Sequence, residues 1–92
     1  MDELEIAVLE LLLFPEHFNN IVAECKVKVG RHVIGDALKT LLHDKYVSPL
    51  RLVEDGKFER SIGYDSDNME AFHYQITAKG IDTLNNILKR QQ

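Results

Sequence analysis

Apolar side chains recur at helical spacing along three segments of the chain. The clearest series lies between residues 31 and 45 and consists of Ile34, Ala37, Leu38, Leu41 and Leu42. This spacing predicts an amphipathic helix with one buried face. Similar series predict a helix that begins at Pro15 and a last helix after Thr77; they consist of Phe18, Ile21, Val22 and Cys25, and of Ile81, Leu84, Ile87 and Leu88.

A first helix is predicted over residues 2–14, and it has apolar residues on two sides. One stripe is formed by Leu4, Ala7, Val8, Leu11 and Phe14, and the other by Ile6, Leu9 and Leu13. A helix with two apolar stripes needs two packing partners. A chain this small supplies one, so the stripe of Ile6, Leu9 and Leu13 is covered either by a second copy of the chain or by its last helix.

After Val47 the apolar period changes to alternation. This alternation predicts strands near residues 50–54, 58–64 and 70–76, and Asp55-Gly56 is typical of a hairpin turn. Pro49 is expected at a strand edge or start. Thr77 is expected to cap the last helix by accepting from the amide of Lys79 or Gly80.

The predicted order is helix, helix, short turn, helix, β-hairpin and helix, which is a winged helix-turn-helix arrangement of the α+β, mainly α class. One domain is expected over residues 1–92, with a helical part at 1–47, a β wing at 48–76 and a C-terminal helix at 77–92.

Gly35 is placed on the exposed face of the third helix. An exposed mid-helix glycine costs roughly 1 kcal/mol, so Gly35 marks either close approach of another molecule or simple tolerance.

Composition indicates an ordinary folded protein, because 45% of the 92 residues are apolar and 28% are charged. The single cysteine excludes an internal disulfide and suits a reducing compartment. Cys25 is expected to be a buried apolar residue. The N-terminus lacks the features of a signal peptide, and the longest apolar run is too short for a membrane span, so a cytoplasmic protein is expected.

Charge is distributed unevenly along the chain, whose net charge is −4. Residues 1–25 contain six acidic residues and no Lys or Arg, whereas residues 26–60 contain eight basic and five acidic residues. A local basic face on an acidic protein is compatible with weak contact to phosphates.

No constellation of catalytic residues is visible in the sequence. The serines lack a nucleophile elbow, and there is no glycine-rich phosphate loop. The four histidines and one cysteine do not have the spacing of a zinc site. An enzyme, a metal site, a cofactor and a large ligand pocket are therefore not expected. Tyr64, Phe72 and Tyr74 are expected to pack in the hairpin, and His73 to lie on its solvent side.

Two stretches resemble winged helix-turn-helix transcription regulators of the MarR and PadR kind. ALKTLLHDKYV at residues 37–47 is similar to the end of their recognition helix. YQITAKGIDTL at residues 74–84 is similar to their last wing strand and following helix, usually written tyrosine-x-leucine-threonine-x-lysine-glycine. Lys45 stands where these regulators commonly have glycine.

The resemblance implies binding of duplex DNA as a homodimer, with the third helix, about residues 31–45, in the major groove. By position, it implies DNA contacts from Lys26, Lys28, Arg31, His32, Gly35, Asp36, Lys39, Arg51, Lys57 and Arg60. Arginine would pair with guanine and lysine with phosphate. The implied dimer interface consists of Ile6, Leu9, Leu13, Leu84 and Leu88.

Acidic residues in the wing, Asp65, Asp67 and Glu70, favour a second hypothesis. In this alternative the chain is a winged-helix protein–protein interaction module that does not bind DNA. One structural feature separates the two hypotheses. DNA binding requires Arg31, Lys39 and the hairpin bases on one face, clear of the three acids, whereas acids beside the third helix would favour the interaction module.

Overall fold

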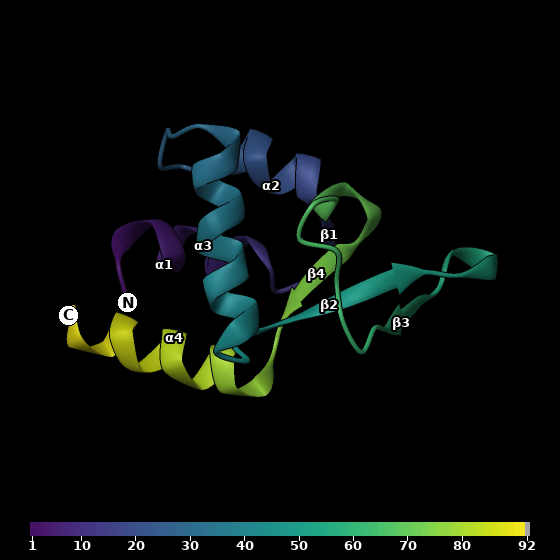
Figure 1. Ribbon diagram of the computed structural model, residues 1–92. Helices are drawn as coiled ribbons and strands as arrows, with labels where there is room; N and C mark the ends of the chain where they lie inside the picture. Colours follow the sequence, from purple (N-terminus) through teal and green to yellow (C-terminus); the bar gives the residue numbers. More distant parts are fainter. Residues whose placement is uncertain (92) are drawn as a thin grey trace.

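Four helices and a four-stranded antiparallel sheet form the fold in the computed structural model, which describes residues 1–91 (Figure 1). The helices are α1 (Glu3–Leu11), α2 (Phe18–Glu24), α3 (Arg31–His43) and α4 (Ala78–Arg90). The strands are β1 (Glu16–His17), β2 (Val47–Leu52), β3 (Phe58–Arg60) and β4 (His73–Ile76). Two short 3₁₀ helices, η1 (Glu54–Gly56) and η2 (Met69–Ala71), lie between β2 and β4. The predicted α+β class is confirmed.

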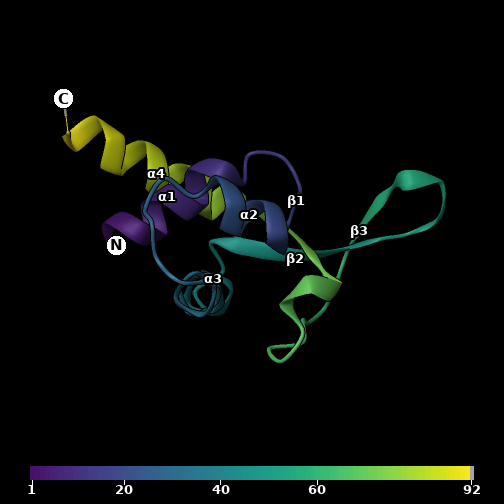
Figure 2. The same cartoon turned by 90° about the horizontal axis from the view of Figure 1, so that it is seen from above.

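The strand order in the sheet is β1-β4-β2-β3. β4 lies between β1 and the first half of β2, with Val47 opposite Ile76. β3 pairs with the second half of β2, where Leu52 lies opposite Phe58. The β2–β3 hairpin therefore extends beyond the rest of the sheet and projects away from the helices (Figures 1 and 2).

The core lies where α1, α3 and α4 pack together and against the sheet. The predicted apolar face of α3 is confirmed, since Ile34, Leu38, Leu41 and Leu42 are buried. Cys25 is also buried, as expected. Tyr74 is fully buried in β4, and its hydroxyl donates to the Met69 carbonyl oxygen at 2.8 Å.

The first two helices are shorter than predicted. α1 begins after a capping box formed by Asp2 and Glu5 and ends at Leu11. The prediction that Pro15 begins a helix is wrong, because Glu16 and His17 pair with β4 instead. α2 begins at Phe18, where the Nδ1 atom of His17 accepts from the Asn19 amide at 3.0 Å.

The strands also differ from their predicted bounds. β2 begins at Val47, and residues 61–64 do not form the expected end of the second strand. Pro49 lies inside β2, where its carbonyl oxygen accepts from the Ser61 amide at the end of the β2–β3 ladder. The turn at Asp55 and Gly56 is confirmed, and both residues have left-handed backbone angles.

The junction between β4 and α4 is held against the end of α3. The Thr77 hydroxyl donates to the Lys45 carbonyl oxygen at 2.7 Å and accepts from the Gly80 amide at 3.1 Å. The Thr77 amide donates to the Tyr46 carbonyl oxygen at 2.9 Å. The expected N-cap is therefore confirmed, and the same threonine connects α4 to the segment that leaves α3.

Gly80 is required at this junction by close packing. A Cβ at Gly80 would overlap the Tyr46 carbonyl oxygen and the Ile76 side chain. Lys79 covers the same segment, because its ammonium group donates to the Asp44 carbonyl oxygen at 2.7 Å and lies 4.6 Å from the Tyr46 ring centroid. The stretch that resembles the regulators thus has a structural role in this chain.

Candidate functional site

Arg31 at the start of α3 is held by neighbours from two other segments. Its Nη2 atom lies 2.5 Å from a carboxylate oxygen of Glu70 and 2.5 Å from the side-chain oxygen of Asn19. The guanidinium group also lies 4.7 Å from the ring centroid of Phe18. Arg31, which was expected to contact a DNA base, therefore already forms an ion pair with a carboxylate of its own chain.

Hydrogen bonds connect the segment that carries Glu70 to β1 and β4. The Nε2 atom of His17 lies 2.7 Å from the Glu70 carbonyl oxygen. Because Nδ1 of His17 accepts from the Asn19 amide, Nε2 is the donor in this second hydrogen bond. With the bond from Tyr74 to Met69, these contacts fix η2 beside the N-terminal end of α3.

A groove of about 450 Å³ separates α3 from the segment at residues 66–70. Its α3 wall consists of Arg31, His32, Gly35, Asp36 and Lys39, and its opposite wall of Ser66, Asp67, Asn68, Met69 and Glu70. Asp67 and Glu70 thus lie across a groove from the residues that were expected to face DNA. Asp65 lines a different pocket, together with Arg51 and Phe72.

Gly35 is not on the exposed face where it was predicted. It is buried beside Phe18, and a Cβ added to it would lie 3.6 Å from the Phe18 Cζ atom. This is an ordinary packing distance, so alanine would fit. Gly35 lines the groove and presents no side chain to a ligand.

The other bases expected to bind DNA near α3 also have partners within the chain. Lys26 forms an ion pair with Glu10 at 2.9 Å, and this carboxylate raises the pKa of the lysine. Lys39 lies 4.0 Å from Asp36. The ammonium group of Lys28 donates to the Cys25 carbonyl oxygen at 3.2 Å.

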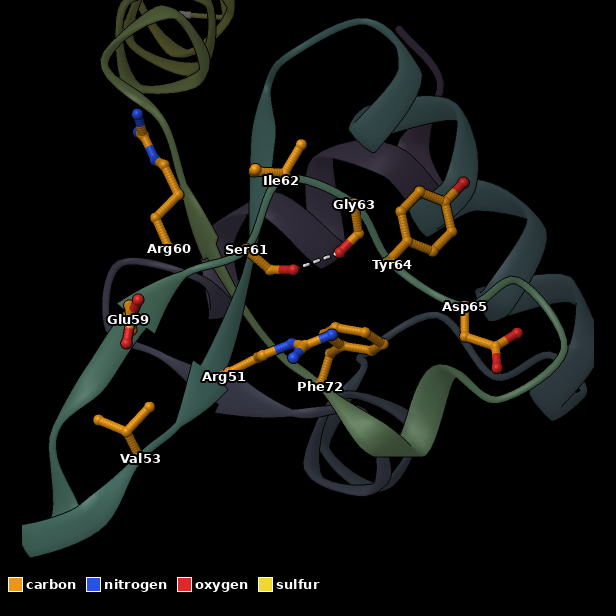
Figure 3. Close-up of a pocket in the computed structure, with 10 residues that line it drawn as sticks. All are labelled: Arg51, Val53, Glu59, Arg60, Ser61, Ile62, Gly63, Tyr64, Asp65 and Phe72. Atoms are coloured by element: carbon orange, nitrogen blue, oxygen red, sulfur yellow. Dashed lines mark hydrogen bonds between the residues drawn. The ribbon is translucent and has the colours of Figure 1, made fainter.

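The β2–β3 hairpin and the segment that follows it have an acidic balance and a second concave surface. From residue 51 to residue 72 the chain carries three basic and six acidic residues. Figure 3 shows Arg51 with its guanidinium group beside Phe72, 5.6 Å from the ring centroid, beneath the segment from Ser61 to Tyr64. The pocket at this position measures about 600 Å³. Lys57 and Arg60, the other bases expected to contact DNA, are exposed on the hairpin.

His73 is half-buried within a row of rings on the sheet. Its ring centroid lies 5.3 Å from that of His17 and 4.8 Å from that of Phe58, both edge to face. Burial lowers the pKa of His73, and the neighbouring His17 lowers it further.

Within residues 1–91, no group of three potential metal ligands comes together.

The expected dimer interface is only partly at the surface. Leu9 and Leu84 are buried in the core of their own chain, so they offer no surface to a second copy. The last helix packs against α1, which is the alternative that the sequence left open for Leu9. Leu13 and Leu88 are exposed and Ile6 is half-buried, and for these three residues dimerisation stays a prediction.

Sequence reasoning missed the contribution of His17 and Asn19 to this site. His17 had been considered only as a possible zinc ligand, although a histidine directly before a helix is able to cap it. The pairing of Arg31 with Glu70 joins residues 39 positions apart and has no local signal in the sequence.

Comparison with protein families and with curated proteins finds no match to this chain. No helix within the described residues has both the length and the apolar character needed to cross a bilayer. Inferences about function therefore depend on the groove, the wing and their charges.

Proposed function

We propose that this chain is a winged-helix protein–protein interaction module that does not bind duplex DNA. The winged-helix assignment is supported by the order of α1, β1, α2, α3, β2 and β4, and by the short connection between α2 and α3. In this assignment α3 occupies the recognition-helix position, and the β2–β3 hairpin with residues 61–72 forms the wing.

The observation that carries the proposal is the position of Asp67 and Glu70 across the groove from α3. A DNA phosphate that approached Arg31 would meet the Glu70 carboxylate already bound there. Most of the affinity of proteins for DNA comes from neutralisation of phosphates by free Lys and Arg side chains. Here Arg31 and Lys39 on α3 and Lys26 before it pair with carboxylates of the chain, and the wing adds net negative charge.

Titration onto labelled mixed-sequence duplex DNA at low salt, followed by fluorescence anisotropy, tests the proposal. We expect no binding by the wild-type chain. Salt-dependent binding, with log K falling against log salt at a slope of about −5, would instead support a DNA-binding regulator with five or six phosphate contacts.

A pair of variants of equal charge makes this titration more specific. One combines Asp67→Asn and Glu70→Gln in the groove, and the other combines Asp55→Asn and Glu59→Gln on the hairpin. If the groove acids exclude phosphate from α3, the first variant gains more affinity for DNA than the second. Equal gains in affinity would show that DNA binding depends on net charge alone and not on the acids in the groove.

A further inference from the structure

His17 joins the start of α2 to η2 through both of its ring nitrogens. Nδ1 accepts from the Asn19 amide at 3.0 Å, and Nε2 donates to the Glu70 carbonyl oxygen at 2.7 Å. A ring with these two hydrogen bonds is neutral, because a protonated imidazole has two N–H donors and no acceptor. A proton on Nδ1 would face the Asn19 N–H group directly. This arrangement therefore requires the uncharged form of His17.

The Glu70 carboxylate stays beside Arg31 mainly because the backbone of η2 is held in place. The ion pair itself is exposed, with 44% of the Arg31 side chain and 55% of the Glu70 side chain accessible to solvent. Exposed ion pairs contribute little to stability. The η2 backbone is held by His17 at Glu70 and by the buried Tyr74 hydroxyl at Met69. Loss of the His17 bond would leave Met69 fixed and allow Glu70 to move away from α3.

A charged His17 ring would have unfavourable neighbours in the recess that it occupies on the sheet. The titratable residues that line this recess are His17, Arg51, Glu70 and His73. Arg51 carries a positive charge, and the His73 ring lies 5.3 Å from the His17 ring. The Glu70 carboxylate is already paired with α3. Glu16 raises the pKa of His73, but burial and His17 together lower it by more. A charged His17 ring is therefore expected to turn out of the recess into water.

We infer that His17 is a pH-sensitive latch on the groove between α3 and residues 66–70. The neutral ring holds Glu70 beside Arg31. A proton taken up in mildly acidic solution breaks the bond to the Asn19 amide, the ring turns out of the recess, and the bond to Glu70 is lost with it. Glu70 then separates from Arg31, and the groove opens. The opening itself needs no partner, whereas its consequence, pH-dependent binding in the groove, rests on the proposed function.

An NMR titration of the isotope-labelled full-length chain from about pH 7.5 to about pH 5.5 tests the latch. Long-range proton–nitrogen spectra report which nitrogen of His17 carries a proton, and nuclear Overhauser contacts between the Arg31 and Glu70 side chains report the closed groove. At neutral pH we expect the Nε2–H form and a closed groove. As the pH falls, we expect the Arg31–Glu70 contact to lose at least about half of its intensity. Protonation of His17, the shift of the Asn19 amide and this loss should share one midpoint.

Two matched histidine substitutions supply the controls. His17→Asn keeps a side chain that caps α2 but has no ring to titrate or to reach Glu70. We expect a weak Arg31–Glu70 contact in this variant at every pH of the titration. His43→Asn makes the same change at the end of α3, where the side chain is 87% exposed, and it is expected to titrate like the wild type. Signals of the buried Leu38 should stay unchanged in all three chains, which separates opening of the groove from unfolding.

Four other outcomes would overturn the latch. They are a wild-type contact between Arg31 and Glu70 in His17→Asn at neutral pH, a contact that survives protonation of His17, a loss of contact with a midpoint different from that of His17, and a simultaneous loss of the Leu38 signals. None of these results bears on the interaction module, because the sample contains no partner. Conversely, binding of the wild-type chain to duplex DNA at neutral pH would overturn the module and leave the latch standing.

Discussion

Lys45 and Gly80 show how single residues determine the geometry of the junction between α3, β2 and α4. Lys45 has a backbone φ of 68°, in the left-handed region that favours glycine. Gly80 lies where a side chain would overlap the Tyr46 carbonyl oxygen. Packing thus requires glycine at position 80, whereas the backbone angle at position 45 disfavours the lysine that is found there.

Replacement Gly80→Ala is expected to destabilise the chain by about 1–3 kcal/mol, because the backbone of Tyr46 must move to accept the new methyl group. Urea denaturation measures this change in the free energy of unfolding. Gly63→Ala is the control, because a Cβ there has no atom within 4 Å. A Gly80→Ala chain as stable as the wild type would contradict the close packing.

Replacement Lys45→Gly is expected to stabilise the chain by about 0.5–1 kcal/mol. Relief of the left-handed strain, about 1–2 kcal/mol, outweighs the greater entropy of glycine in the unfolded chain. Thermal or urea unfolding measures the gain. Lys57→Gly is the control and is expected to destabilise, because Lys57 has an extended backbone with a φ of −89°. A loss of stability in the Lys45→Gly variant would show that contacts of the Lys45 side chain stabilise the chain by more than the backbone strain destabilises it.

Among the secondary-structure elements, the sequence predicted best those with a complete periodic pattern. The apolar series of α3 and the Thr77 cap of α4 are local signals, and both are confirmed. β1 is a two-residue strand with no period of its own, and it forms only because β4 lies beside it. The strand expected at residues 58–64 ends at Arg60 because the chain then turns back toward η2.

Positions in the candidate site were harder to predict than the elements that carry them. Sequence analysis predicts a DNA contact for Arg31. It separately identifies Glu70 as an acid that would favour the interaction module if it lay beside the third helix. Their contact depends on the path of residues 61–72 across the molecule, which follows from His17, Tyr74 and the length of β3 together. No local pattern encodes such a path, so only the structure reveals that the acids lie beside α3.

The stability of the sheet, where the His73 ring packs against His17 and Phe58, is expected to depend on pH through His73. Its pKa in the folded chain is lowered by burial, so the unfolded chain binds the proton more readily. The contribution to stability is therefore fully present above the ordinary histidine pKa of about 6.5 and is lost as the pH falls through the lower folded value. Urea unfolding between neutral and mildly acidic pH measures this loss. His73→Gln is expected to show a shallower dependence, and an unchanged dependence would refute the assignment.

As a whole, the molecule separates a helical body from a projecting hairpin. Its principal extents are 43, 27 and 21 Å, and the long direction reflects the β2–β3 projection seen in Figures 1 and 2. Near α3, Lys26, Arg31 and Lys39 form ion pairs with carboxylates of the chain, whereas the hairpin displays apolar residues and an Arg60 without an ion pair among residues 1–91. This division of surfaces suits contact with a protein better than contact with a phosphate backbone.

The most direct test of the interaction-module account is the composition of the complex that the chain forms in its own cells. The tagged chain is purified under native conditions, treated with nuclease, and its mass is measured by size-exclusion chromatography with light scattering. The account predicts a complex with a second protein, of defined stoichiometry and unchanged by nuclease. A complex that contains DNA and dissociates on nuclease treatment would contradict it, as would a free monomer or a homodimer alone.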